Sequence, residues 1–212
     1  TQDGNSSSGS GAFIGPDLIV TNAHVIENAI LDRIFIYNDR VGVLKAQLLA
    51  EGAPASANSG KPDLALLKVD APAGGQFLAL ATGQQGQTVI AATFPGAYTS
   101  SNAGFKKWLD DPQSAPGAIP PLLDVQILNA RFDKADGFEY IFHTAIIGRG
   151  SSGGPLADEC GRLVGVNVGA ESLKVDKSIP FFQAISDKTV EQFVNQHGLG
   201  PIVRDSAVCG AA

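Results

Sequence analysis

Short apolar runs alternate with turn-forming residues over most of this chain. Ten runs of strand length are bounded by glycine, proline, asparagine or aspartate, at residues 12–15, 17–21, 33–37, 41–50, 64–69, 88–93, 122–132, 138–144, 162–169 and 178–185. Short runs of this kind, rich in β-branched residues and closely spaced, are typical of antiparallel strands. The pattern therefore predicts an all-β body, built either as barrels or as a sandwich.

One segment has helical rather than strand periodicity. Residues 186–197 place Val190, Phe193 and Val194 on one face at helical spacing. Ser186 or Asp187 can cap the start of such a helix, and Gly198 can end it. We therefore expect a C-terminal helix that closes the β body.

Two further segments lack strand periodicity. Residues 1–10 are polar and rich in glycine and serine, which predicts a flexible lead-in. Residues 94–121 form a stretch longer than most connections, with one possible amphipathic turn at 105–109. Two interpretations stay open for it: a surface excursion with its aromatic residues packed down, or a lid near the functional site.

Composition and charge exclude several classes of partner. The 212 residues are 44% hydrophobic and 17% charged, as in ordinary globular proteins, and the formal net charge is −6. No basic cluster exceeds the pair Lys106–Lys107, so neither nucleic acid nor an anionic membrane is an expected partner. No apolar run reaches the roughly 18 residues of a membrane span. Because the chain starts at Thr1 without a signal-peptide pattern, we expect a trimmed product that lacks its targeting segment.

The two cysteines, Cys160 and Cys209, leave two possibilities open. They can form one disulfide that joins the C-terminal tail to the body, or remain free thiols in a reducing compartment. A disulfide would indicate export to a periplasm or to the outside of the cell. No metal site is expected, because two cysteines and three scattered histidines do not make a zinc-binding pattern.

The segment from Gly148 to Leu156, GRGSSGGPL, has the composition that a nucleophilic serine needs. Acyl transfer requires an exposed hydroxyl and nearby backbone N–H groups that point at the developing oxyanion. Glycine permits such a turn because it adopts backbone angles closed to other residues. Ser152 is the candidate nucleophile, and Gly150, Ser151 and Ser152 form the candidate oxyanion loop, with the N–H groups of Gly150 and Ser152 as its donors. A glycine- and serine-rich loop is by itself a weak signal. It could also bind phosphate, but the segment lacks the Lys-Ser/Thr ending of a P-loop.

A base and a carboxylate precede this loop in the chain. His24 follows the run DLIVTNA, and an imidazole is the side chain best suited to accept a hydroxyl proton. Asp63 opens the apolar run LALLKV, where it can hold the imidazole in one tautomer. Each residue alone is more commonly a strand-end histidine or a strand-capping aspartate. Together they predict a His24, Asp63 and Ser152 triad in a cleft between two units.

Several segments resemble the trypsin/chymotrypsin superfamily, and within it the HtrA/Deg-like branch. They are GSGAFIG with LIVTNAHV, DLALLKV, FPG at 94–96, GSSGGPL and GRLVGVNVG, in this order over residues 9–185. The resemblance implies two six-stranded antiparallel β-barrels (the chymotrypsin fold) with a C-terminal helix, proteolysis by a triad, and no cofactor. The expected units are the lead-in 1–10, a barrel over 11–85 with His24 and Asp63, a barrel over 86–185 with Ser152, and the helix and tail over 186–212.

The resemblance also implies a specificity pocket and shows two departures. The pocket would be walled by residues 145–149 and 167–170, including Ile146, Ile147, Val168, Gly169 and Ala170. No acid stands at Ile146, the expected base, so cleavage after small or medium aliphatic residues is expected rather than cleavage after lysine or arginine. Ser151 stands where trypsin-type zymogens carry an aspartate, and the chain begins TQDGN. The oxyanion loop must therefore be ordered by something other than a buried α-amino group.

The sequence thus predicts a serine endopeptidase that acts on protein or peptide substrates through an acyl-enzyme. The alternative is a protease fold that is catalytically silent or latent and serves as a binding or regulatory module. The resemblance leaves an oligomer possible, and PDZ domains, which HtrA-type relatives often carry, do not fit within these residues.

Overall fold

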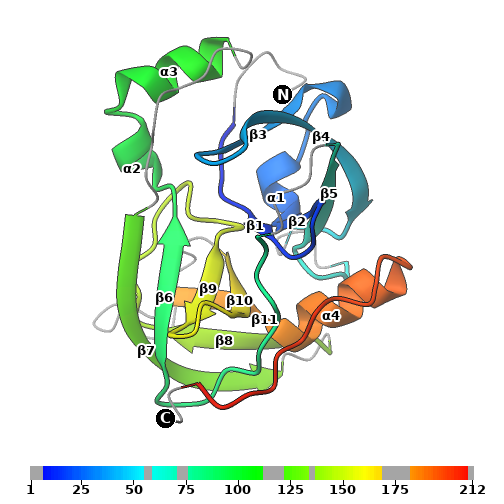
Figure 1. The fold of residues 1–212 in the computed structure, drawn as a ribbon, viewed down its shortest axis with the longest axis vertical. Coiled ribbons are helices and arrows are strands. Elements are labelled where there is room, and N and C mark those ends of the chain that lie inside the picture. Colours follow the sequence, from blue (N-terminus) through cyan, green and yellow to red (C-terminus); the bar gives the residue numbers. More distant parts are fainter. Residues whose placement is uncertain are drawn as a thin grey trace.

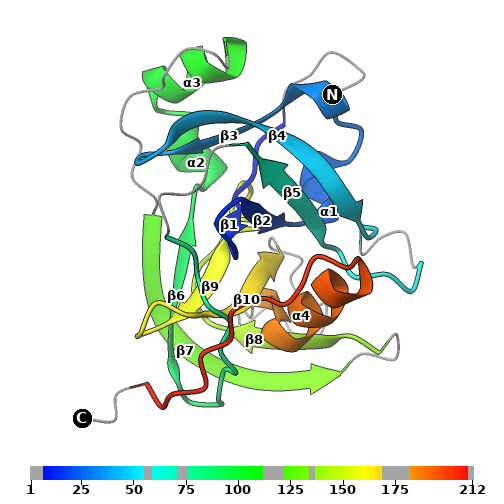
Figure 2. The same ribbon diagram turned by 45° about the vertical axis from the view of Figure 1, so that its right-hand side comes forward.

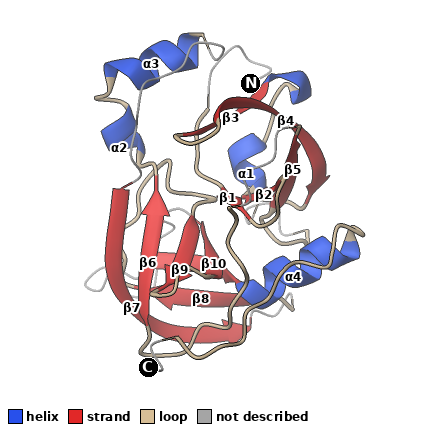
Figure 3. Ribbon diagram, in the orientation of Figure 1, coloured by secondary structure: helices blue, strands red, loops and turns tan. Residues whose placement is uncertain are grey.

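The computed structural model describes residues 7–54, 59–70, 76–111, 122–133, 137–168 and 182–209. Strands dominate these residues and fall into two antiparallel units, as Figure 3 shows. In Figure 1 the N-terminal unit occupies the upper right and the C-terminal unit the lower left. The prediction of an all-β body is confirmed. Within the described residues, no helix has the length and apolar character needed to cross a membrane.

The N-terminal unit is a five-stranded sheet in the order β1-β2-β5-β4-β3. Its strands are β1 (Ala12–Phe13), β2 (Leu18–Thr21), β3 (Ile34–Asn38), β4 (Gly42–Glu51) and β5 (Ala65–Val69). A short helix α1 (Ala23–Ile26) follows β2, and a 3-10 turn η1 (Leu31–Arg33) precedes β3. A small apolar core, built around Ile19, Ile34 and Leu67, fills one face of this sheet.

The register of β2 against β5 decides where the predicted base and carboxylate meet. Thr21, the last residue of β2, pairs with Ala65, the first residue of β5. Because the strands are antiparallel, the chain leaving β2 and the chain entering β5 lie at the same edge of the sheet. His24, three residues after Thr21, and Asp63, two residues before Ala65, are therefore brought to one place.

The N-terminal unit differs from the expected six-stranded barrel, because five strands form it within the described residues. The segment after residue 76 runs beside β1, where the Leu78 N–H donates to the Phe13 carbonyl at 2.9 Å. It then turns away: Leu80 forms bridges to Leu163 and Arg204 instead of continuing along β1. Within the described residues, this segment forms no ladder with β1.

The C-terminal unit is a closed six-stranded barrel, in the order β10-β11-β8-β7-β6-β9, as the resemblance implied. Its strands are β6 (Thr88–Thr93), β7 (Leu122–Asp133), β8 (Glu139–His143), β9 (Pro155–Asp158), β10 (Leu163–Val168) and β11 (Phe182–Ser186). The pair Val166 and Pro155 joins β10 to β9 and closes the ring. Strand β9 was not among the predicted runs, since it begins with a proline inside the glycine-rich segment and holds only two apolar residues after it.

The long segment between β6 and β7 contains two helices, α2 (Gly96–Thr99) and α3 (Ala103–Asp110). Asn102 caps α3 by accepting the Phe105 N–H at 2.9 Å. Phe105 and Trp108 are buried against Phe35, Tyr37, Val43 and Phe94. Figure 1 shows α3 at the top, beyond β3, far from the barrel to which its chain belongs. Phe105 and Trp108 of this segment are therefore packed down on the N-terminal sheet, in line with the first of the two interpretations.

Helix α4 (Asp187–Gln196) confirms the predicted C-terminal helix. Ser186 caps it by accepting the Thr189 N–H at 3.3 Å, and Val190, Phe193 and Val194 are buried. These three residues join the largest core, which also holds Ile14, Val20, Leu66, Val166 and Ile185. Because that core takes residues from both β units and from α4, it fixes the two units against each other.

A disulfide joins the C-terminal tail to the barrel. Of the two possibilities left open for the cysteines, this is the disulfide rather than the free thiols. Cys160 in the β9–β10 turn is bonded to Cys209, with 5.8 Å between their Cα atoms. Figure 2 shows the tail running from α4 across the barrel toward the C-terminus. Buried Arg162 pairs with Asp158 at 2.7 Å, and the hydrogen bond that the Arg162 guanidinium donates to Asp158 raises the pKa of Arg162 further. The Arg162 guanidinium also donates to the Ala207 carbonyl at 2.5 Å, so it links the turn to the tail.

Candidate active site

His24 and Asp63 are in direct contact. His24 Nδ1 lies 2.7 Å from Asp63 Oδ2, and the His24 backbone N–H donates to Asp63 Oδ1 at 3.0 Å. The Asp63 side chain is 3% exposed, whereas that of His24 is 34% exposed. The Nδ1 edge of the imidazole is therefore fixed by a buried carboxylate, while about a third of the side chain remains exposed to solvent.

Asn22 fixes the backbone on both sides of this pair. Its side-chain amide donates to the Asp63 carbonyl at 2.8 Å, and its backbone precedes α1, which carries His24. Asn22 is fully buried, so this bond is shielded from water. The run TNAH thus contributes more than the histidine: the asparagine holds the aspartate's segment beside the helix.

Ser152 lies in the tight turn between β8 and β9. The Gly153 N–H donates to the Asn167 carbonyl at 2.8 Å, and the Ser152 carbonyl accepts the Ser10 N–H at 2.9 Å. Gly153 has a φ of +84°, and a Cβ there would collide with the Ser10 carbonyl and with Thr21 Oγ1. Glycine is therefore required directly after Ser152 by both its backbone angle and its surroundings.

Two glycines show that the Ser152 turn packs against the segment that carries His24. A Cβ on Gly153 would lie 3.1 Å from the backbone nitrogen of Asn22. A Cβ on Gly9 would meet Val25 Cγ1 at 2.6 Å and the Ser152 carbonyl at 3.3 Å. The segment around Ser152 therefore lies close to residues 22–25, which include His24. The structure thus joins His24 to Asp63 directly and packs the turn that holds Ser152 against the segment that carries His24.

The predicted oxyanion loop has one peptide whose orientation is fixed from outside. The Gly96 N–H donates to the Arg149 carbonyl at 2.6 Å. In a trans peptide the N–H points opposite to the C=O, so the Gly150 N–H is directed away from Gly96. Among the described residues, no hydrogen-bond acceptor takes that N–H. The Ser151 N–H, which was not among the two expected donors, donates to the Gly148 carbonyl at 3.0 Å.

Ser151 instead orders the loop through its side chain. It is fully buried, and its Oγ lies 3.0 Å from Thr93 Oγ1, at the end of β6. The Gly148 N–H also reaches this Oγ at 3.3 Å. A neutral hydroxyl pair thus occupies the place where the resemblance puts a charged aspartate. These hydrogen bonds of Ser151 hold the loop against the end of β6 without a buried α-amino group.

The residues expected to wall a specificity pocket are less well supported. Ile146, the expected pocket base, is 70% exposed, and Ile147 is buried in the core of the barrel. The chain alternates direction through 145–147, so Ile146 points outward while its two neighbours point in. Val168 is buried in the core shared by the two units. The role of Ile146 as pocket base stays a prediction, and Gly169 and Ala170 lie outside the described residues.

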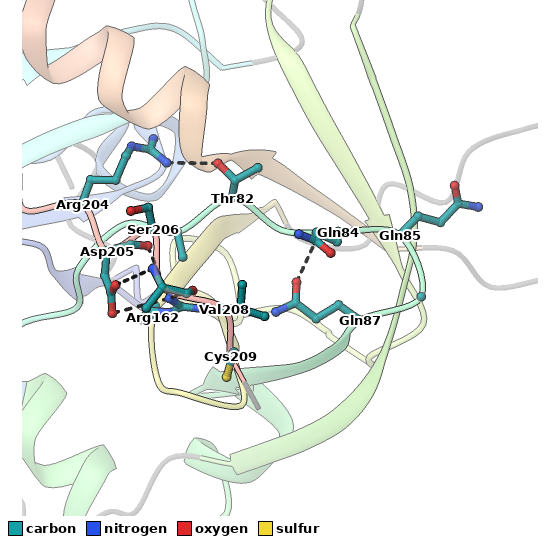
Figure 4. A pocket seen from close by; sticks show the side chains of 13 residues that line it. Thr82, Gln84, Gln85, Gln87, Arg162, Arg204, Asp205, Ser206, Val208 and Cys209 are labelled. Carbon is teal, nitrogen blue, oxygen red and sulfur yellow. Dashed lines mark hydrogen bonds and ion pairs between the residues drawn. The ribbon is translucent and has the colours of Figure 1, made fainter. Parts of the chain in front are cut away.

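A separate cavity of about 450 Å³ opens beside the C-terminal tail. Figure 4 shows Gln84, Gln87, Arg162 and tail residues around it. None of the three candidate triad residues lines it, and its arginines already pair with carboxylates. Asp158, Cys160 and Cys209 come close enough for a metal site in the described residues, but both sulfurs are joined in the disulfide. Neither place has the groups that acyl transfer needs.

Comparison with protein families finds one matching model. The trypsin-like peptidase domain matches residues 9–166. Among curated proteins, serine protease HTRA1B of Danio rerio is 31% identical over 200 residues, covering 88% of this chain and 34% of the relative. Serine protease HTRA1A of the same fish is 30% identical over the same shares. The chain thus spans about a third of the length of these relatives.

Solved structures with a similar fold include two of Rv3671c from Mycobacterium tuberculosis. The protease in its inactive form matches with a TM-score of 0.62 and 20% identity, over 90% of this chain and 83% of that chain. A serine-to-alanine mutant, also in an inactive form, matches with a TM-score of 0.64 and 19% identity, over 92% and 83% of the two chains. At this level of identity the likeness concerns the fold.

Proposed function

The chain belongs to the trypsin-like peptidase family, and we propose that this serine endopeptidase cuts peptide bonds with a His24, Asp63 and Ser152 triad. One observation carries the assignment. The buried Asp63 carboxylate holds His24 at 2.7 Å beside the turn that presents Ser152. A carboxylate, an imidazole and a serine in this order are the groups that acyl transfer requires.

Each residue has a definite part in the proposed reaction. Ser152 Oγ attacks the carbonyl carbon of the scissile bond while His24 Nε2 takes the hydroxyl proton. His24 then gives this proton to the leaving amine as the carbon–nitrogen bond breaks, which leaves an acyl-enzyme on Ser152. Water, deprotonated by His24, hydrolyses the ester and restores the serine. Asp63 keeps the proton on Nδ1, so that Nε2 is the free acceptor.

The amides of Gly150 and Ser152 are the proposed donors to the oxyanion. The Gly150 N–H is directed away from Gly96, because the Arg149 carbonyl of the same peptide faces Gly96. A donor of this kind typically stabilises the transition state by about 3–4 kcal/mol. Ser151 orders the loop through its hydroxyl and supplies no amide.

Covalent labelling tests this function directly. A fluorophosphonate probe should modify the wild-type protein at Ser152, located by peptide mass analysis, and the Ser152→Ala variant should stay unlabelled. The same variant should lose hydrolysis of a peptide library while its melting temperature stays within about 2 °C of wild type, since one hydroxyl is removed. Turnover that persists in Ser152→Ala would reject the assignment. A wild-type protein that never labels would favour a catalytically silent module.

We also propose a preference for small or medium aliphatic residues at the cleavage site. It is supported by residues 145–149, AIIGR, which carry no carboxylate to pair with a lysine or arginine side chain. Profiling on the peptide library measures this preference, and efficient cleavage after arginine would contradict it. The disulfide between Cys160 and Cys209 supports the further proposal that the protein works in an oxidising, exported compartment.

A further inference from the structure

We propose that Ser10 is a positioning residue for the oxyanion loop: its hydroxyl keeps the Gly150 amide in the orientation that the reaction uses. The inference rests on the proposed function of Ser152, and nothing in the sequence assigned Ser10 a part in it. Ser10 lies in the lead-in to β1, 6% exposed, where it contacts both sides of the nucleophile turn.

Four hydrogen bonds converge on this one residue. Its Oγ donates to the Gly150 carbonyl at 2.7 Å and accepts the Phe94 N–H at 2.9 Å. Its backbone N–H donates to the Ser152 carbonyl at 2.9 Å, and its carbonyl accepts from Thr21 Oγ1 at 2.7 Å. The Ser10 hydroxyl therefore both donates and accepts a hydrogen bond, and the backbone N–H and C=O of Ser10 are each paired as well.

These bonds matter because Gly150 has little to hold it in place. Its φ is +87°, and without a side chain its two flanking peptides can rotate at low cost. The peptide before it is held by the Gly96 N–H on the Arg149 carbonyl, and the peptide after it by Ser10 Oγ on the Gly150 carbonyl. Because the carbonyls of Arg149 and Gly150 are both held by hydrogen bonds, the two peptides that flank Gly150 cannot rotate freely. The direction of the Gly150 N–H is thereby fixed.

Ser10 also connects the two groups that hold Gly150. The Phe94 N–H bonded to its hydroxyl begins the turn that carries Gly96. A Cβ on Gly150 would lie 2.6 Å from the Phe94 carbonyl and 2.8 Å from the Gly96 nitrogen, so this turn packs directly on the glycine. Removing the hydroxyl would leave the Gly150 carbonyl and the Phe94 N–H without their partner in a poorly solvated place. Both sides of the glycine would then be freed together.

The expected consequence is specific to the transition state. In Ser10→Ala, kcat should fall by about 10- to 100-fold, somewhat less than the 10²–10³ typical for complete loss of one oxyanion donor. KM should stay within about twofold, because the substrate's ground state does not need the oxyanion donors. A residue with a purely structural part would lower stability without this split between kcat and KM.

The test uses the full chain, the best peptide from the library, and two inhibitors of different kinds. An aldehyde of the same peptide forms a tetrahedral adduct on Ser152, so its inhibition constant should rise by the factor by which kcat/KM falls. The corresponding peptide acid, which resembles a product, should bind both proteins equally. Ser10→Thr keeps the hydroxyl and should recover kcat relative to Ser10→Ala. Ser8→Ala, at an exposed neighbouring serine, is the matched control and should behave as wild type.

If Ser10→Ala does not fold, Ser10→Cys provides a side chain of similar size with a weaker hydrogen bond, and the same split is expected. The proposal is overturned if kcat and aldehyde inhibition stay within twofold of wild type, or if only the melting temperature changes. Its failure is distinguishable from failure of the proposed function. In the first case the wild-type protein labels with fluorophosphonate at Ser152 and Ser10→Ala labels equally fast. In the second case the wild-type protein does not label.

Discussion

Asp63 binds His24 through both carboxylate oxygens. Oδ2 lies 2.7 Å from His24 Nδ1, and Oδ1 accepts the His24 backbone N–H at 3.0 Å. The second contact means that the aspartate fixes the start of α1 as well as the ring. A residue bound at both places has little freedom to rotate, which is what a general base in a preorganised site needs. The carboxylate is buried, so its bonds to His24 are not weakened by water.

Asp63→Asn should abolish most activity without unfolding the protein. An amide N–H facing Nδ1 would favour the tautomer with its proton on Nε2, and that nitrogen could no longer accept a proton from Ser152. A loss of about 10⁴ in kcat is expected from the wrong tautomer. Steady-state hydrolysis of the library peptide measures this loss.

Asp70→Asn is the matched control for this substitution. Asp70 lies exposed at the opposite end of the same strand run, away from His24. It should keep full activity. Equal losses in the two variants, or activity in Asp63→Asn near that of wild type, would remove Asp63 from the reaction.

Removal of the disulfide should lower stability and leave the chemistry intact. The bond closes a loop of 49 residues, for which chain entropy gives about 4 kcal/mol of stabilisation. The double variant Cys160→Ser, Cys209→Ser should therefore melt roughly 10 °C lower by calorimetry, at about 2–4 °C per kcal/mol for a chain of this size. Reduction of the wild-type protein should reproduce the shift, and reductant should not affect the double variant. A melting temperature that does not respond to reductant would contradict the prediction.

Trp108 should anchor the excursion between β6 and β7. It is buried beside Phe105 and lies 6.0 Å, between ring centroids, from Tyr37 of β3. Trp108→Ala should lower the free energy of unfolding by about 3–5 kcal/mol, as large-to-small changes in packed sites do. Because the same excursion begins with the turn that holds Arg149, kcat should fall as well.

Urea unfolding followed by circular dichroism, together with peptide hydrolysis, measures both effects. Lys106→Ala lies on the exposed side of the same helix and should change neither. If Trp108→Ala alters neither stability nor kcat, α3 is not part of the structure that supports the active site.

Glu51 should make stability depend on pH. Partial burial, and then the nearby carboxylate of Glu27, raise its pKa above the ordinary value of 4.5, while Lys61 opposes the shift. The charged form of Glu51 is thus disfavoured in the folded state. The resulting loss of folding stability is absent below the unfolded-state pKa and grows as pH rises through the folded-state pKa. Glu51→Gln should melt higher than wild type at pH 7 and equally at pH 3.5. The exposed Glu159→Gln is the control, and a melting temperature of Glu51→Gln at or below that of wild type at pH 7 would contradict the prediction.

Local sequence signals predicted the elements of this fold well. Strand runs and the C-terminal helix are properties of neighbouring residues, namely apolar spacing, capping and turn chemistry. Thus α4 follows Ser186 as expected, and the six strands of the barrel fall on predicted runs except β9. The short motifs around His24 and Asp63 also selected two residues that lie in direct contact.

What the sequence could not give depends on contacts between distant segments. Ser10 stands within GSGAFIG, but its bonds to Gly150 and Ser152 join segments about 140 residues apart, which no local pattern shows. The direction of Ile146 depends on the turn geometry of 145–147 rather than on its apolar character. Likewise, Ser151 stands in for an aspartate only because Thr93 lies opposite it.

By itself, the sequence determined the all-β body and its closing helix and singled out the candidate triad residues, because those follow from residue type and local periodicity. The tertiary structure alone decided which backbone groups contact the predicted oxyanion loop and that Phe105 and Trp108 pack on the opposite unit. It also decided that the first unit forms a five-stranded sheet within the described residues. The physical reason is that hydrogen-bond direction and packing depend on where distant segments meet, and no short window of residues contains that information.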